Sequence, residues 1–486
     1  MNTISLGKKR EMFWDSYLVD TSKTTAFSRL IEPTLKEECF VFDQGPETKT
    51  TISYPCIVKD DKGYKMYYMP WYDINGKVHL AVVESTDGIH WTKPHLNIFD
   101  YPELECNNIV IDQLPDGCFV FYDTNPNCPA EEKYKAIGML RLPNEEGKLK
   151  RALWCFISPD GYHFTRSHIL TKAGYFDSLN TAHWADGRYV CYFRNFHNIK
   201  DVPWSDGIDD INRPGAYKNI NEAIRDVRVM YSEDFKTWTE PKRISFYDGK
   251  DYPLYTNNII PYERAPHILV GFPVRYCERK EWTPNNDQIG SCAIKIDSME
   301  NHEKRSGLAV TDCIFMHSRD AENWNRFNEA FMTPGYEHEH NWVYGDCYPA
   351  YGFVDSGKEN YYMYTIDWHR SFGYPKPMNR YEIRKDGFAC YMADGEERIL
   401  VTKPLIFEGS ALHLNFKTSA YGYIYVDVLD EEGNPLSEKE SFEIFGDTID
   451  RTICFADGND FSAYANKPVR LRFRMRDAKI FSLKFE

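Results

Sequence analysis

The chain has 486 residues and a formal net charge of −15, from 58 Lys and Arg against 73 Asp and Glu. This balance argues against a nucleic-acid partner, because a phosphate backbone repels an acidic surface. No apolar run approaches the ~18 residues of a membrane span, so we expect no membrane partner either. The first ten residues lack an apolar signal core and the 13 Cys form no CxxC pair, which predicts a cytoplasmic protein with free thiols.

The N-terminal region predicts one strand and a long loop. Residues 11–20 alternate between apolar and polar side chains, and we expect them to complete the last unit of a ring. Residues 21–50 are mixed and polar and predict a loop that leads to the first strands, at 54–59 and 64–71.

A short motif then sets the period of the chain. Ser85-Thr86-Asp87-Gly88-Ile89-His90-Trp91 follows a strand-forming run, and Asp-Gly between such runs is typical of a tight turn. Related segments, which we call Asp turns, recur with Asp at 87, 160, 234, 320 and, in degraded form, 386, at intervals of 73, 74, 86 and 66 residues. Four strands of ~6 residues with their turns fill such a period, which is one propeller blade. Five Asp turns therefore predict five blades.

The strands between the Asp turns follow the same order in each blade. Two long insertions, at about 197–223 and 277–307, interrupt the third and fourth blades. Blade two is predicted to contain strands at 107–111, 118–123 and 134–139, and blade three at 178–184 and 188–194. Blade four is predicted to contain strands at 254–260 and 268–276, and blade five at 347–354 and 361–367.

After Tyr391 the Asp turns stop and the strands alternate more cleanly. Roughly 90 residues of alternating strands predict a separate β-sandwich. The expected fold is therefore all-β: a five-bladed β-propeller over residues 1–395 followed by a C-terminal β-sandwich over 396–486.

This layout resembles the five-bladed β-propeller glycoside hydrolases. The nearest in architecture is glycoside hydrolase family 32, the invertase and levanase group, and families 43, 68 and 130 share the propeller. The resemblance covers nearly the whole chain in layout, whereas the invertase motifs are absent: no Arg-Asp-Pro occurs, and Glu105-Cys106 matches the Glu-Cys motif by letters only. The Asp turns also resemble sialidase Asp boxes shortened by one residue, and we interpret them as structural.

The resemblance implies catalytic carboxylates at the start of the innermost strands, one per blade. Cleavage of a glycosidic bond needs a proton donor and a second carboxylate that activates water or attacks carbon. The candidates at those positions are Asp177, Glu105, Asp346 and Asp251. Asp177 ranks first because aromatic residues flank it and a strand follows it. The alternative for each is a turn residue or a solvated loop carboxylate.

Six further residues are candidates for binding substrate. Arg194 and Arg275 end otherwise apolar strands, where a charge must be paired or face water, and an inter-blade salt bridge is the alternative. The other four could bind hydroxyl groups or stack on a sugar ring, with core or turn packing as the alternative; they are Asn108, Trp342, Tyr344 and Asp123. His338 and His340 lie two residues apart, but nothing completes a tetrahedral set, so we expect no metal and no cofactor.

The leading functional hypothesis is a glycoside hydrolase that acts on a carbohydrate. One alternative is a glycoside phosphorylase, in which Arg194, Arg275 and His183 or His197 would bind phosphate. The other is a non-catalytic glycan-binding propeller. The sequence leaves open the sugar, the linkage, the stereochemical outcome and the oligomeric state.

Overall fold

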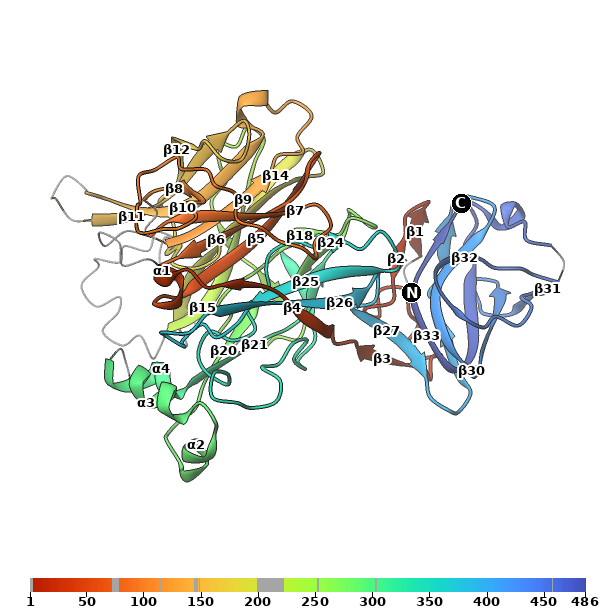
Figure 1. Ribbon diagram of the computed structural model, residues 1–486. Helices are drawn as coiled ribbons and strands as arrows, with labels where there is room; N and C mark the ends of the chain where they lie inside the picture. The colour runs from red at the N-terminus through yellow and green to blue at the C-terminus, as the bar shows by residue number, and fades with distance from the viewer. Residues whose placement is uncertain are drawn as a thin grey trace.

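The computed structural model describes residues 3–71, 78–113, 116–143, 147, 149–198, 223–250, 253–301, 304–456 and 458–486. Within these ranges strands are the main secondary structure, and the chain forms a propeller joined to a C-terminal β-domain (Figure 1). Four short helices occur there: α1 (Gly45–Thr48), α2 (Pro284–Gln288), α3 (Cys292–Asn301) and α4 (Lys304–Leu308). None of the described helices is long and apolar enough to cross a bilayer.

The first three blades are four-stranded antiparallel sheets whose strands follow chain order from the axis outward. Blade one contains β5 (Ile52–Asp60), β6 (Gly63–Pro70), β7 (Leu80–Ser85) and β8 (Ile109–Ile111). Blade two contains β9 (Asp116–Tyr122), β10 (Tyr134–Pro143), β11 (Leu149–Ser158) and β12 (Thr165–Thr171). Blade three contains β13 (Thr181–Ala185), β14 (Arg188–Asn198), β15 (Ala223–Ser232) and β16 (Lys242–Arg243).

The last two blades depart from that simple order. Blade four contains β18 (Ile260–Pro261), β19 (Leu269–Gly271), β22 (Met316–Ser318) and β23 (Asn323–Arg326), with β17 (Ser245–Phe246) parallel to β23 and a separate hairpin of β20 (Val274–Glu278) and β21 (Ala309–Cys313). Blade five contains β24 (Val354–Asp355), β25 (Asn360–Ile366), β26 (Lys376–Arg384) and, from the other end of the chain, β4 (Thr34–Phe42).

Each Asp turn comes directly after the third strand of its blade. In the first of them, the Asp87 Oδ1 accepts hydrogen bonds from the backbone N–H groups of Ile89 (2.8 Å) and His90 (2.9 Å), and the Ser85 Oγ accepts one from Gly88 (2.8 Å). Because the strands are antiparallel, the Asp turns lie on the face opposite to the one where the innermost strands begin. We call that second face, on which the innermost strands begin, the funnel mouth.

Two sequence predictions about strand assignment are wrong. Residues 109–111 form the outermost strand of blade one, paired with β7, and are not the first strand of blade two. The ring is closed by β4, which lies in the predicted loop, and not by residues 11–20. β4 is an edge strand with mostly exposed side chains, so it lacks the clean alternation that predicts a strand. Phe13 and Trp14 are instead buried at the junction with the C-terminal domain.

The C-terminal domain is organised around one long antiparallel ribbon. β30 (Leu412–Leu429) pairs with β33 (Arg470–Phe485), and a register shift between Thr418 and Tyr423 divides the ribbon into two halves. Each half has its own neighbours, and one apolar core includes residues of both. The neighbours are β2 (Glu11–Met12), β3 (Phe27–Leu30), β27 (Ala389–Ala393), β28 (Arg398–Val401), β31 (Pro435–Glu440) and β32 (Asp447–Thr452), with a parallel pair β1 (Ile4–Gly7) and β29 (Leu405–Phe407) beside them.

The predicted division between residues 395 and 396 stays a prediction. Strand pairing nevertheless assigns β1, β2 and β3, from the N-terminal 30 residues, to the C-terminal sheets, and β27 with them. In Figure 1 the N-terminal strands β1 and β2 accordingly lie beside the C-terminal domain. A division by residue number alone therefore does not describe the two units.

The fifth Asp turn joins the two units. Its strand β26 is followed by β27 of the C-terminal sheet, because β4 already occupies the outer edge of blade five. Asp386 is fully buried and accepts hydrogen bonds from the Tyr262 Oη (2.6 Å) and Arg264 Nε (2.8 Å) of blade four, and from the Asn415 Nδ2 (3.0 Å) and Ser482 Oγ (2.7 Å) of the C-terminal domain. One carboxylate thus holds groups from both units.

Candidate active site

The segments that lead into the innermost strands of blades two and three, β9 and β13, lie side by side at the funnel mouth. Asp116 is the first residue of β9, and Asp177 lies in the segment that leads to β13. Gly117 has a φ of 61°, and a side chain there would meet the Ser178 carbonyl oxygen at 2.3 Å, so only glycine permits this approach. The Asn180 Nδ2 donates hydrogen bonds to the carbonyl oxygens of Gly117 (3.2 Å) and Phe176 (3.0 Å), which fixes the two segments side by side.

Asp116 and Asp177 form an unequal pair of carboxyl groups. The Asp116 Oδ1 is buried and has no hydrogen-bond partner among the described residues. Burial, and then the charge of Asp177, raises the pKa of Asp116 to about 7, against the opposing effect of Arg151 and Arg194. The Asp177 side chain is 25% exposed and its Oδ1 lies 3.8 Å from the Nε of Arg194. Below about pH 7, therefore, Asp116 is mostly protonated.

Arg194 is a buried cation that lies beside Asp177. Its Nη1 donates a hydrogen bond to the Tyr255 carbonyl oxygen (3.0 Å), which also accepts one from the Ser178 Oγ (2.6 Å). Its guanidinium carbon lies 5.0 Å from the centre of the Tyr255 ring. Blade three and the segment before blade four thus position Arg194 beside Asp177.

Tyrosine side chains form much of the surrounding wall. The Tyr255 ring centre lies 5.5 Å from that of Tyr344 and 5.6 Å from that of Tyr348, and Tyr276 lies 5.5 Å from Tyr344. Burial raises the pKa of Tyr344 and Tyr348 well above the ordinary value, so both hydroxyl groups stay protonated. Aromatic faces with polar tips are suited to sugar rings, which present C–H groups on one face and hydroxyl groups at the edge.

Three more arginines stack on tyrosines in the same region. The guanidinium carbon lies 3.4 Å from the ring centre of Tyr175 for Arg151, 4.0 Å from that of Tyr276 for Arg225, and 4.7 Å from that of Tyr344 for Arg370. The Nε atoms of all three arginines are buried without a hydrogen-bond partner in the described part of the chain. The site is therefore strongly positive, although the whole chain is acidic.

Three of the sequence-predicted residues come together here: Asp177, Arg194 and Tyr344. Glu105 does not, because it is exposed and precedes β8, the outermost strand of blade one. Asp251 lies outside the described residues.

The other predicted binding residues have structural partners. The Asn108 Nδ2 donates to the Tyr68 Oη (2.9 Å) and the Val82 carbonyl oxygen (2.7 Å) in the blade core. Asp123 is at the far end of β9 from Asp116, paired with Lys135 at 2.7 Å. Arg275 forms a two-point ion pair with Asp312 across the β20–β21 hairpin, at 2.7 and 2.5 Å. The Trp342 Nε1 donates to the Gly335 carbonyl oxygen at 2.9 Å.

Asp346 belongs to a second buried carboxyl pair. It lines a cavity of about 30 Å³ together with Asp367, and its Oδ2 accepts a hydrogen bond from the Val343 N–H at 2.8 Å. Burial, with a contribution from the charge of Asp367, raises the pKa of Asp346 to about 8. Asp346 is therefore a protonated, enclosed group at neutral pH and is not one of the carboxyl groups joined at Asn180.

Asp116, Arg151, Arg225 and Arg370 were missed from the sequence. Asp116-Gly117 directly precedes the apolar run 118–121, and that pair is typical of a turn. Arg151 and Arg225 lie near the starts of the third strands β11 and β15, and Arg370 lies in the connection after β25, so their local pattern does not place them beside Asp116 and Asp177. Across the described residues, no three His, Cys, Asp or Glu side chains converge so as to hold a metal ion.

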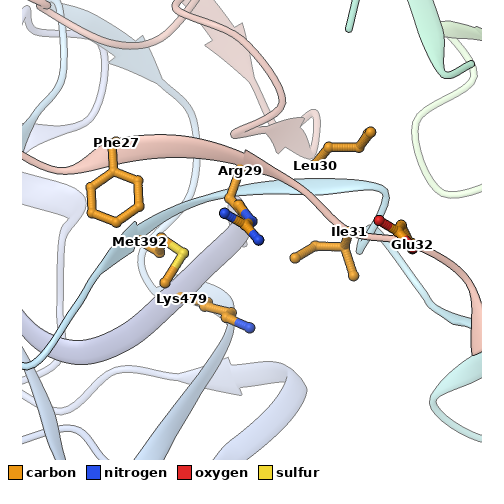
Figure 2. Close-up of a pocket in the computed structure, with 7 residues that line it drawn as sticks. All are labelled: Phe27, Arg29, Leu30, Ile31, Glu32, Met392 and Lys479. Carbon is orange, nitrogen blue, oxygen red and sulfur yellow. The ribbon is translucent and has the colours of Figure 1, made fainter. Parts of the chain in front are cut away.

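A larger pocket lies away from the funnel, beside the C-terminal sheet. It has a volume of about 480 Å³ and is lined by Phe27, Arg29, Leu30, Ile31, Glu32, Met392 and Lys479. Figure 2 shows Phe27, Arg29 and Ile31, from β3 and the residue after it, near Met392 and Lys479 of the neighbouring strands. The lining of this pocket contains one carboxylate, that of Glu32, and no second acid. The pocket therefore has no counterpart of the Asp116–Asp177 arrangement.

No protein-family model and no curated protein sequence matches the chain. Solved structures with a similar layout include an N-acetylgalactosamine deacetylase from F. plautii (13% identity, 73% of this chain and 95% of that chain, TM-score 0.41). A structure described under the GH130 family of mannoside phosphorylases, with hydrolases that target β-1,2 mannosidic linkages in Candida mannan, has 11% identity over 73% and 94% (TM-score 0.39). The Bombyx mori GH32 β-fructofuranosidase has 8% identity over 93% and 95% (TM-score 0.40). At this level of identity and superposition, no residue role is transferred from them.

Proposed function

We propose that the protein is a glycoside hydrolase in which Asp116 donates a proton to the leaving oxygen and Asp177 is the second carboxylate. The observation that carries this proposal is the unequal pair at the funnel mouth: Asp116, whose Oδ1 is buried without a hydrogen-bond partner among the described residues, beside Asp177, whose Oδ1 lies 3.8 Å from the Arg194 Nε. Two neighbouring carboxyl groups in different surroundings can divide the acid and base roles between them.

In this mechanism each neighbour of the pair has a role. The Arg194 guanidinium lies 3.8 Å from the Asp177 Oδ1 and orients Asp177, which activates a water molecule or attacks the anomeric carbon. Asp177 in turn disfavours a negative charge on Asp116, which keeps the proton available for the departing alcohol. The tyrosine rings of Tyr255 and Tyr344 would bind the apolar face of the sugar.

The test is a series of aryl glycosides that differ in the acidity of the released phenol. We expect Asp116→Asn to lower turnover by about 10²–10⁴-fold with poor leaving groups and much less with good ones, because only the former need the acid. Asp177→Asn should lose turnover with both kinds, and the matched control Glu105→Gln should behave as the wild type. Unchanged turnover in both Asp variants would leave a non-catalytic glycan-binding propeller as the better explanation.

A glycoside phosphorylase is the second candidate, and the arginine cluster favours it. Arg151 and Arg194 lie close enough to act on the pKa of Asp116, so a phosphate ion could be bound beside the proton donor. Turnover that requires inorganic phosphate, with a sugar 1-phosphate detected by phosphorus NMR, would support this candidate over hydrolysis. Release of free sugar at the same rate without phosphate would support hydrolysis.

A further inference from the structure

Arg225 is a buried cation for which the described chain provides no counter-ion. Its side chain is 8% exposed, its Nε has no hydrogen-bond partner, and no described carboxylate forms an ion pair with it. Burying a guanidinium group without an opposite charge costs free energy, so such a group persists where function needs it. The Tyr276 ring, 4.0 Å from the guanidinium carbon, stabilises Arg225 only in part.

Other arginines surround the same aromatic strip. The guanidinium carbon of Arg305, on α4, lies 5.4 Å from the Tyr276 ring, and that of Arg370 lies 4.7 Å from the Tyr344 ring. The Tyr276 and Tyr344 ring centres are 5.5 Å apart. Three guanidinium groups, from β15, α4 and the connection after β25, thus flank two adjacent tyrosine rings.

This absence of a counter-ion is local to the funnel. Elsewhere buried arginines face carboxylates at short range: Arg470 pairs with Asp20 at 2.9 Å, and Arg10 with Asp450 at 2.7 Å. A chain with a net charge of −15 has an ample supply of carboxylates. The local excess of positive charge around Arg225 therefore points to an anion that comes from outside the chain.

We propose that Arg225, with Arg370, binds an anionic group carried by the sugar substrate, a carboxylate or a sulfate ester, while Tyr276 and Tyr344 bind the ring that carries it. This inference rests on the proposed glycosidase function and names its substrate class as acidic oligosaccharides. Arg194 is already engaged with Asp177, whereas Arg225 lies on the next strand, so the anionic group sits beside the cleaved bond and does not take part in its cleavage. Guanidinium groups suit both anions because their paired N–H donors match two oxygens.

The experiment measures binding in the Asp116→Asn protein by calorimetry, so that its outcome does not depend on turnover. The ligands are uronate-containing and sulfated oligosaccharides, each beside its carboxyl-reduced or desulfated counterpart, together with inorganic phosphate. We expect at least one acidic oligosaccharide to bind about tenfold or more tightly than its neutral counterpart, with the difference shrinking as salt rises. The ligand class that shows this difference in affinity, the uronates or the sulfated sugars, identifies the anion.

Variants then assign the difference to Arg225. Arg225→Gln should abolish the preference for the acidic ligand and Arg225→Lys should retain part of it. Arg188→Gln is the matched control, because Arg188 stacks on Tyr231 at the same 4.0 Å but at the opposite end of the β14–β15 pair. Equal binding of acidic and neutral ligands would overturn the proposal, as would binding of inorganic phosphate without any preference for acidic sugars. Wild-type turnover in Asp116→Asn would count against the catalytic proposal alone.

Discussion

The pKa of Asp116 shows how burial and a neighbouring charge change the chemistry of a carboxyl group. Its pKa of about 7 comes from burial and from the charge of Asp177, whereas Arg194 stands beside Asp177 itself. A proton donor must carry its proton, so kcat/KM should fall as pH rises through about 7. In Asp116→Asn, assayed with a good leaving group, that fall should vanish. A fall at the same pH in the variant would assign it to another group.

Asp346 gives a second prediction at this scale, on stability. Its pKa in the folded protein, about 8, lies above the ~3.9 of an unfolded chain, so the folded state binds the proton more tightly. Asp346 therefore lowers stability progressively as pH rises from about 4 to about 8. Asp346→Asn mimics the protonated form and should raise the melting temperature at pH 8 to 9, with little change near pH 4. Equal shifts at both pH values in thermal unfolding would contradict this account.

The local sequence pattern points to two residues of the candidate site, whose roles stay predictions. Asp177 stands between aromatic residues and a strand, and Arg194 is a charge in an apolar run; both patterns point to a special environment. Asp116 was not predicted as a site residue because Asp-Gly is equally typical of a turn. The surroundings of Asp116 depend on Asn180, which lies 64 residues further along the chain. Arg225 was not predicted as a site residue because the absence of a counter-ion around it depends on its three-dimensional surroundings alone.

At the scale of the element, the Asp turns behave as independent structural units. The Asp160 Oδ1 accepts hydrogen bonds from the backbone N–H groups of Tyr162 (2.8 Å) and His163 (3.0 Å), on the face away from the funnel. Asp160→Ala should therefore lower the free energy of unfolding by about 1–2 kcal/mol, without changing turnover. Chemical denaturation and a steady-state assay check the two halves of this prediction. A large loss of turnover in a fully folded variant would show that the turn contributes to the site.

The same elements explain how far the fold could be predicted. The Asp turns give the correct number of blades because the first four are local hydrogen-bonded units that depend on their own residues, and the fifth keeps the same place after the third strand of its blade. The strand β8 was assigned to the wrong blade because it has only three residues and a long connection, 92–108, separates it from its Asp turn. The position of β4 depends on a partner at the other end of the chain, which no local pattern reveals.

For the whole molecule, Asp386 is a buried carboxylate that links the two units. Its carboxylate is fully buried among the Arg264 guanidinium, the Tyr262 hydroxyl and groups of the C-terminal domain. Against the effect of burial, Arg264 holds the pKa of Asp386 below the ordinary value. Asp386→Ala would leave Arg264 without its partner, so we expect a loss of about 3–5 kcal/mol and separate melting of the two units in calorimetry. Asp160→Ala is the matched control from an Asp turn within one unit. A single cooperative transition with a loss as small as the control's would contradict this role.

The closure of the ring by β4 also has a consequence for biosynthesis. Glu37 on β4 and Arg380 on β26 are hydrogen-bonded although they lie 343 residues apart. At typical rates of translation, β4 leaves the ribosome on the order of 20–70 s before its partner does. During that interval the first four blades can form, but blade five has no edge for β4 to join. The nascent chain therefore carries an unpaired, charged strand until its synthesis is nearly complete, and the acidic and basic side chains of that strand protect it from pairing with other nascent chains.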